Sequence, residues 1–234
     1  MRTSGEGACR FCLKTCSGST IGRHLQSCKA KMEKDVAEAS KSKKPERIFH
    51  IKIFGGGEYW LHIEMKASSK LSDMDKFLRD IWLECCGHLS QFIIDRQAYM
   101  PSYAGDLREM EAKSMGVQMG KVLGVKDKFG YEYDFSTTTY LEGQIISERQ
   151  GALKEKVRIL ARNRMPEAAC TQCGKSATQF CTDCEEFYCL ECLADHECGD
   201  EMALPVVNSP RMGECGYSGE DDPDDFDERQ IAGK

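Results

Sequence analysis

The chain has 234 residues, of which 30% are charged and 41% are hydrophobic, and its formal net charge is -6. This length allows one or two domains, and the lack of any long apolar run argues against a membrane-spanning helix and a membrane partner. The polar start, Met1 to Ser4, has no apolar signal region, so we expect a soluble, cytoplasmic protein.

The charge is distributed unevenly along the chain. Residues 1–50 carry 11 Lys and Arg against 5 Asp and Glu, whereas residues 166–234 carry 4 against 17. We therefore do not expect nucleic acid to bind over the whole protein surface, although the basic N-terminal segment can contact phosphates locally.

The 14 cysteines gather mainly in two end segments rather than along the whole chain. Such clustering is typical of metal ligands. A disulfide framework is the alternative, but it needs an oxidising compartment, and the sequence shows no secretory segment. We therefore predict metal-bound cysteines.

Residues 9–28 have the spacing C-x2-C-x11-H-x3-C and predict a zinc finger. The His and the last Cys are four residues apart, which places both on one face of a helix. Cys16 is expected to pack in the core of the finger rather than to bind metal. A single finger contacts only about three base pairs, so the pattern does not by itself indicate sequence-specific DNA binding. The predicted ligands are Cys9, Cys12, His24 and Cys28.

A polar, basic stretch interrupted by Pro45 follows the finger. We predict a finger with a basic helix over residues 1–40 and a solvated linker over residues 41–47. The alternative is a basic strip that binds nucleic acid or an acidic partner, using residues 9–47.

Residues 48–165 predict a central α+β domain, with an antiparallel sheet covered by a helix. The apolar residues between 71 and 85 recur at helical spacing. Alternating and β-branched segments predict strands over 48–54, 59–65, 89–94, 129–135, 140–146 and 157–161. A short helix over 107–115 and a short strand over 120–125 are also expected.

Cys85, Cys86 and His88 lie at the end of the predicted central helix. Adjacent cysteines rarely serve one tetrahedral zinc in the way that a Cys-x2-Cys pair does. We therefore expect a structural role for these residues, with a ligand role as the alternative.

Residues 166–219 predict a double zinc module that contains eight closely spaced ligands. The ligand pairs can be used in sequence or interleaved. We favour interleaving, because the short link between Cys184 and Cys189 suits a hairpin shared by two sites. One zinc would then be bound by Cys170, Cys173, Cys189 and Cys192, and the other by Cys181, Cys184, His196 and Cys198. With the finger, the expected total is three Zn2+ ions.

The spacing of this module resembles the cross-brace zinc modules of the B-box type, and its final His-x-Cys looks like the end of an AN1-type finger. A B-box usually ends in a wider His pair, so Cys215 is the alternative to Cys198 as the eighth ligand. Both module types are mostly protein-interaction modules, so the resemblance implies binding rather than catalysis.

The order of the hairpin, LSDMDKFLRDIWLECCGHLSQF, YEYDFSTTTYL and a tail ending NSPRMGECGYSG resembles the plasmid ORF-three-like family, first named from an Ri plasmid. This resemblance covers roughly residues 47–165 and the tail to about 219. It implies the fold but no settled activity. The family's YDF segment is often followed by a Gly-Asp-x-Trp turn, which is replaced here by Ser136 to Thr139.

No arrangement in the sequence indicates a catalytic site, so we expect a non-catalytic zinc-binding adaptor that docks on a protein or ribonucleoprotein assembly. The alternatives are a nucleic-acid-binding accessory protein of a mobile element and a metal-dependent enzyme. Residues 220–234 form an acidic tail, expected to be disordered or to dock on a basic partner.

Overall fold

The computed structural model describes residues 5–42 and 44–219. These residues form two compact units, residues 5–77 with 89–164 and residues 78–88 with 165–219. The predictions made for the acidic tail, residues 220–234, lie outside the described residues.

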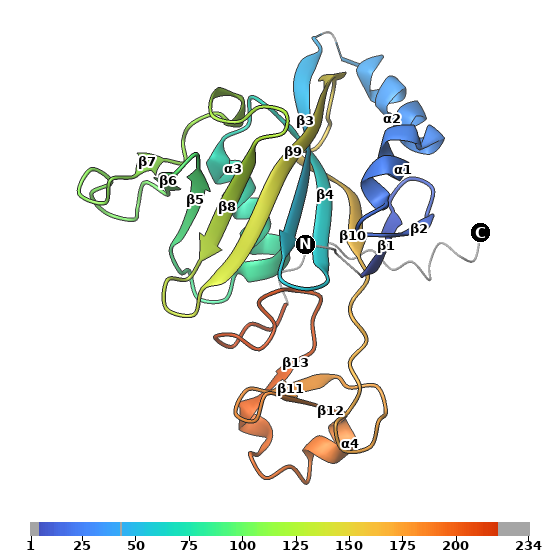
Figure 1. The fold of residues 1–234 in the computed structure, drawn as a ribbon, viewed down its shortest axis with the longest axis vertical. Coiled ribbons are helices and arrows are strands. Elements are labelled where there is room, and N and C mark those ends of the chain that lie inside the picture. Colours follow the sequence, from blue (N-terminus) through green and yellow to red (C-terminus); the bar gives the residue numbers. More distant parts are fainter. Residues whose placement is uncertain (1–4, 43, 220–234) are drawn as a thin grey trace. The chain divides into compact units, whose positions relative to one another are not determined.

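The first unit is built on a ten-stranded sheet in the order β2-β1-β10-β4-β3-β9-β8-β5-β6-β7 (Figure 1). Neighbouring strands are antiparallel except β6 and β7, which are parallel. The strands are β1 (Glu6–Cys9), β2 (Thr15–Ser17), β3 (Glu46–Gly55), β4 (Tyr59–Lys66), β5 (Ser90–Ile94), β6 (Gln97–Met100), β7 (Lys113–Ser114), β8 (Lys128–Tyr133), β9 (Thr139–Gly151) and β10 (Val157–Asn163). The helices are α1 (Ile21–Ser27), α2 (Lys29–Ala39), α3 (Leu71–Leu78) and the 3-10 turn η2 (Met119–Lys121).

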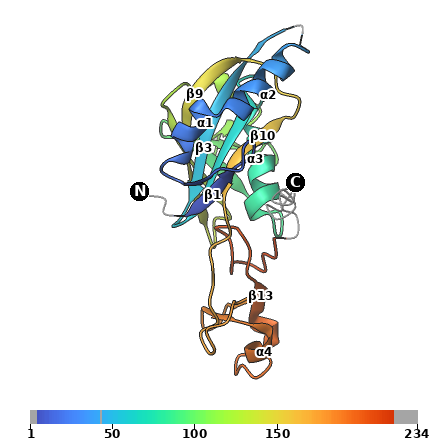
Figure 2. The same cartoon turned by 90° about the vertical axis from the view of Figure 1, so that its right-hand side faces the viewer.

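Side chains alternate between the two faces of this sheet. On β4, Leu61, Ile63 and Met65 are fully buried on one face. On the β8 part of the sheet, Tyr131 donates a hydrogen bond of 2.8 Å to Asp75 of α3, so α3 covers that region. The other face of β4 carries Trp60, His62 and Glu64, which meet residues of α1 and α2. Figure 2 shows α1 and α2 running along the sheet.

The structure confirms the six predicted strands of the central region, and their ends shift by no more than two residues except that β9 continues to Gly151. The predicted helix over 71–85 is divided, because α3 ends at Leu78 and a π-helical turn, η1 (Arg79–Leu83), follows it. The predicted helix over 107–115 and strand over 120–125 are wrong, since the chain there forms turns, β7 and η2. The structure shows a large mixed sheet with few helices. The stricter assignment to the α+β class stays a prediction.

The predicted boundary between an N-terminal finger and a central domain is also wrong. Strand β1 pairs with β10, and Gly7 lies opposite Asn163. Cys9, Ile21 and Leu25 share a buried core with Trp60 and with residues of β10. A Cβ on Gly7 would lie 2.6 Å from the Trp60 ring, so glycine permits this close packing. Sequence spacing revealed the finger but could not show that its strand extends the central sheet.

Limited proteolysis should therefore cut the exposed connection between α2 and β3 without releasing the finger. Trypsin cleavage after Lys41 is expected to leave the N-terminal fragment attached to the rest of the first unit, because β1 and the shared core hold it. Native size-exclusion chromatography followed by mass spectrometry checks this. A fragment that elutes alone would contradict it.

A buried charge network joins α2 to the sheet. The Glu64 carboxylate, whose side chain is 2% exposed, accepts hydrogen bonds from Lys31 at 2.8 Å and from Arg149 at 2.8 and 2.9 Å. Arg158 also pairs with Glu64 and with Asp35 of α2. Burial alone would raise the pKa of Glu64, but these cations lower it to about 2. The network lines a cavity of about 240 Å³ and keeps its own charges paired.

His50 of β3 lies beside this network, and its Nε2 is 2.8 Å from Nδ1 of His62. Burial lowers the pKa of His50 from 6.5 to about 4, so the folded protein keeps this ring neutral where the unfolded chain would protonate it. Between these values the unfolded state binds more protons, so stability falls as pH falls.

Because of this shift, the stability difference between the wild type and His50→Phe should change with pH. We expect the wild type to lose stability relative to the variant as pH falls from 6.5 toward 4, by on the order of 3 kcal/mol over the full range. Urea denaturation of both proteins at pH 7 and pH 5 with zinc present should show about 2 kcal/mol of this change, and acid effects common to both cancel. An unchanged difference would contradict the assignment.

The second unit contains a three-stranded sheet in the order β12-β11-β13. Its core is formed by metal-ligand candidates together with Ala177, Tyr188 and Leu193. The elements are η1, β11 (Gln179–Cys181), β12 (Glu186–Tyr188), α4 (Leu190–Leu193), η3 (Asp200–Met202) and β13 (Ala203–Pro205). Across the described residues of both units, the helices are too short and too polar to cross a bilayer.

Candidate metal centres

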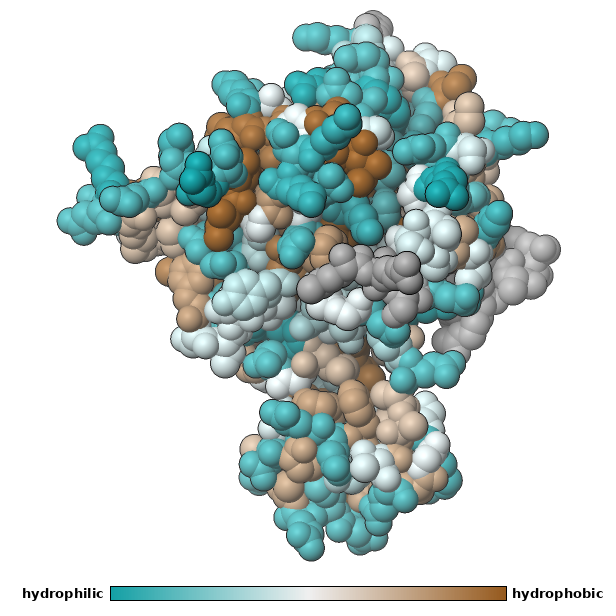
Figure 3. Space-filling view, in the orientation of Figure 1, coloured by the Kyte–Doolittle hydropathy of each residue, from teal (hydrophilic) through white to brown (hydrophobic). Residues whose placement is uncertain are grey.

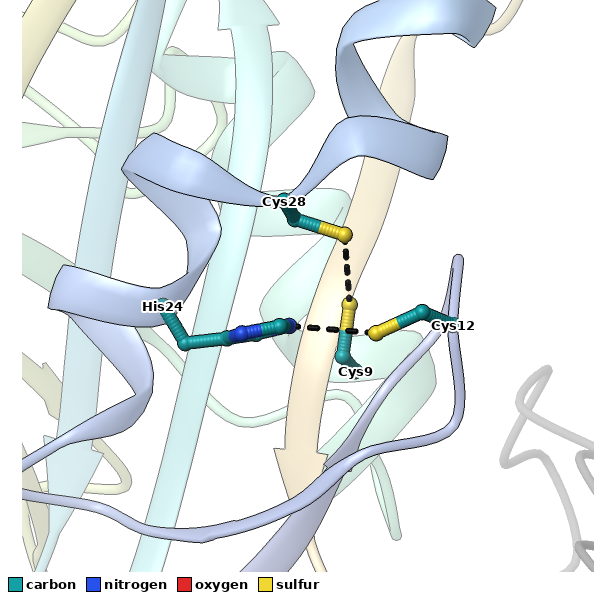
Figure 4. A group of neighbouring side chains, drawn as sticks. All are labelled: Cys9, Cys12, His24 and Cys28. Atoms are coloured by element: carbon teal, nitrogen blue, oxygen red, sulfur yellow. Dashed lines mark hydrogen bonds between the residues drawn. The ribbon is translucent and has the colours of Figure 1, made fainter.

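The four ligands predicted for the finger converge in the first unit (Figure 4). Cys9 ends β1, Cys12 lies in the following turn, His24 projects from α1, and Cys28 separates α1 from α2. Their ligand atoms lie within 4.8 Å of one another. Cys16 packs against the neighbouring core and is not in this group, which agrees with its expected packing role.

The distances between sulfur atoms match a tetrahedral metal rather than a disulfide. A zinc ion about 2.3 Å from each sulfur requires sulfur–sulfur distances of about 3.8 Å in a tetrahedron. The Sγ atoms of Cys9 and Cys28 are 3.8 Å apart, and those of Cys173 and Cys189 are 3.7 Å apart. A disulfide would bring two sulfurs to about 2.05 Å.

In the second unit, the structure groups the eight predicted ligands in the interleaved way. Cys170 and Cys173 meet Cys189 and Cys192. The second group contains Cys181, Cys184, His196 and Cys198, and Nε2 of His196 lies 3.5 Å from Sγ of Cys184. The hairpin of β11 and β12 connects the two groups, because one Cys pair precedes β12 and another follows it.

The three Cys-x2-Cys turns that begin these groups share a backbone shape. The residue after the second Cys has a positive φ in each of them: 61° at Leu13, 72° at Gly174 and 57° at Glu185. In two of them the N–H of that residue donates to the carbonyl of the first Cys, at 2.9 Å from Leu13 and 2.8 Å from Gly174. A tight turn of this kind aims two thiols at one point, which explains why the spacing alone identified these ligands.

Hydrogen bonds and burial shift the pKa values of some of these thiols, in both directions. Backbone donation, chiefly from Cys189, lowers the pKa of Cys170 to about 6. Hydrogen bonding with Cys173 raises the pKa of Cys192 to about 12, and burial raises the pKa of Cys9 to about 12. Metal ligands must be deprotonated, so an ion would displace the protons that the crowded thiols otherwise keep.

A fourth group was not predicted as a metal site. It brings together Cys85, Cys86, His88 and Cys215, with ligand atoms within 4.8 Å of one another. The structural role expected for Cys85, Cys86 and His88 is therefore corrected to a candidate ligand role, which was the alternative. Cys215 belongs to this group and does not replace Cys198. The only sequence signal was a Cys-Cys-x-His motif with an unassigned cysteine far along the chain.

Neither a family model nor a curated protein matches the chain. A solved structure of a protein of unknown function from Methanosarcina mazei Go1 is similar, with 14% sequence identity and a TM-score of 0.41. The match covers 50% of this chain and 67% of that chain. Similarity at this level carries no functional argument, so membership of the plasmid ORF-three-like family stays a prediction.

Proposed function

We propose that this chain is a non-catalytic adaptor, stabilised by Zn2+ in the finger group and in the two interleaved groups, that binds a protein or ribonucleoprotein assembly. The observation that carries the proposal is that each group already offers four protein ligand atoms. A tetrahedral zinc with four protein ligands has no position for a substrate, whereas catalytic zinc keeps one open. Such ions stabilise small folds and leave the surface to bind partners.

Helix α2 presents an apolar surface suited to a protein partner. Met32 is 55% exposed and Val36 is 70% exposed, and Val36 is the fourth residue after Met32, so they lie on one helix face. Hydrophobic residues are visible over α2 in Figure 3. An exposed helix face of this kind fits an apolar groove on another protein.

Nucleic acid is the second candidate, because Lys14, Arg23 and Lys29 are exposed around the finger. The charge count of this region overstates its free positive charge, however. Lys31 is buried against Glu64, and Arg47 pairs with Glu148 at 2.7 Å. This internal pairing favours the protein partner. The reducing cytoplasm, where thiols remain available for zinc, is the expected location.

Affinity capture from the native cytoplasm tests the proposal, with tagged wild type compared with Met32→Asp/Val36→Asp. We expect the wild type to retain a defined protein set after nuclease treatment, and the double variant to lose it. Val125→Asp, at a position 40% exposed on a different part of the first unit, is the matched control and should keep the set.

Two results would overturn this proposal. Capture that disappears with nuclease and weakens steeply with salt would favour the nucleic-acid alternative. Identical capture by the wild type and the α2 double variant would remove α2 as the docking surface.

A further inference from the structure

The group at the end of η1 lies outside the three zinc sites of the proposed function. Sγ of Cys215 is 3.2 Å from Nε2 of His88 and 4.0 Å from Sγ of Cys86. These distances resemble the edges of a zinc tetrahedron, about 3.8 Å between sulfurs, and exceed the disulfide length of about 2.05 Å. We propose that Cys85, Cys86, His88 and Cys215 bind a fourth Zn2+ ion. This site goes beyond the adaptor function and does not depend on it.

The segment that supplies three of the ligands is held in a defined shape. Arg79 of η1 pairs with Glu84 at 2.8 Å and donates a hydrogen bond of 2.6 Å to the carbonyl of His88. The N–H of Gly87 donates to Glu84 at 2.6 Å. Gly87 has a φ of 73°, which favours glycine and lets the chain reverse between Cys86 and His88. In this group the reversal at Gly87 takes the place of the Cys-x2-Cys turn that begins each of the other three groups.

The loop that supplies Cys215 is anchored by buried polar groups. Ser209, 1% exposed, donates a hydrogen bond of 2.5 Å to the carbonyl of Trp82 and accepts one of 2.9 Å from the N–H of Arg211. Further along the loop, the N–H of Tyr217 donates to the carbonyl of Glu214 at 2.9 Å. The loop is therefore fixed against η1 on the N-terminal side of Cys215, and the ion would fix Cys215 itself.

Arg211 adds an electrostatic reason for a metal at this place. Its guanidinium is fully buried and donates to Sγ of Cys85 at 3.5 Å. A zinc ion with three thiolates and one neutral imidazole carries one net negative charge, which an adjacent guanidinium offsets. A hydrogen bond to a metal-bound thiolate also orients that ligand.

The fourth site should exchange its ion most readily. Each of the other three groups contains at least one buried ligand, whereas none of the four ligands here is buried. A chelator therefore reaches this ion first. Its removal would free Cys215 from the segment that carries Cys86 and His88 while the other ions remain.

The test is metal counting by native mass spectrometry and elemental analysis on full-length protein purified under reducing conditions. We expect four zinc ions in the wild type and three in Cys215→Ser. His88→Cys should keep four, because four thiolates also form a closed zinc site. Cys16→Ser is the matched control and should keep four, since Cys16 is outside the four groups that the described residues form.

Release to a chromogenic chelator gives a second readout. One equivalent of zinc should leave the wild type in a fast phase that is absent from Cys215→Ser. A wild type with three ions that Cys215→Ser also retains would overturn the fourth site while leaving the other three intact. Four ions in Cys215→Ser would overturn it as well. If Cys215→Ser misfolds, loss of the fourth ion in His88→Gln but not in His88→Cys would still support it.

Discussion

Cys189→Ala is expected to destabilise both interleaved zinc sites of the second unit, with release of more than one ion or easier chelation of both. Cys189 belongs to one group, but β12 lies between Cys184 of the other group and Cys189. The small core of the module combines ligands of both groups, including Cys170 and Cys181. Apparent zinc-binding energies of about 10–16 kcal/mol in zinc-finger peptides are large enough that such a module folds only with its metal.

Zinc stoichiometry and chelator-release kinetics of Cys189→Ala, compared with Cys173→Ala, measure this coupling. Cys12→Ala is the control, because the finger group lies in the first unit and should lose its own ion alone. A clean loss of one ion from Cys189→Ala, with the neighbouring site as slow to release as in the wild type, would contradict the shared hairpin.

Glu64→Gln should cost the first unit about 3–5 kcal/mol of unfolding free energy. The substitution keeps the shape of the side chain but leaves Lys31, Arg149 and Arg158 with one fewer buried counter-charge. Removing one charge of a buried network lowers the unfolding free energy by more than the intact network contributes to it, because the remaining charges stay desolvated.

Urea denaturation at pH 7 with excess zinc measures this loss as a lower midpoint at an unchanged slope. Glu148→Gln is the matched control, since its ion pair with Arg47 has side chains 38% and 40% exposed and should change stability by about 1 kcal/mol or less. Equal effects from the two substitutions would show that the buried network does not stabilise the unit.

Much of this architecture follows from local sequence patterns. Alternation predicted β3, β4, β8 and β9, because each strand has an apolar face. The Cys-x2-Cys turns predicted three ligand groups, since both thiols come from one turn. These are features that a short window of sequence contains.

The missed features depend on contacts between distant residues. The pairing of β1 with β10 joins Gly7 to Asn163, and no local pattern specifies that register. The fourth group brings Cys86 and Cys215 together, and neither cysteine belongs to a Cys-x2-Cys turn. The charge network likewise links Lys31 of α2, which the sequence predicts only as part of a basic helix, to the buried Glu64 of β4. In each case the sequence showed suitable residues but not their partners.

The most direct measurement is the mass of the native, folded chain compared with its mass after acid denaturation. We predict a difference of four zinc ions, corrected for the protons that they displace, and loss of the folded charge-state distribution when a chelator removes them. A native species with folded charge states and no bound metal would contradict the claim that zinc stabilises this protein.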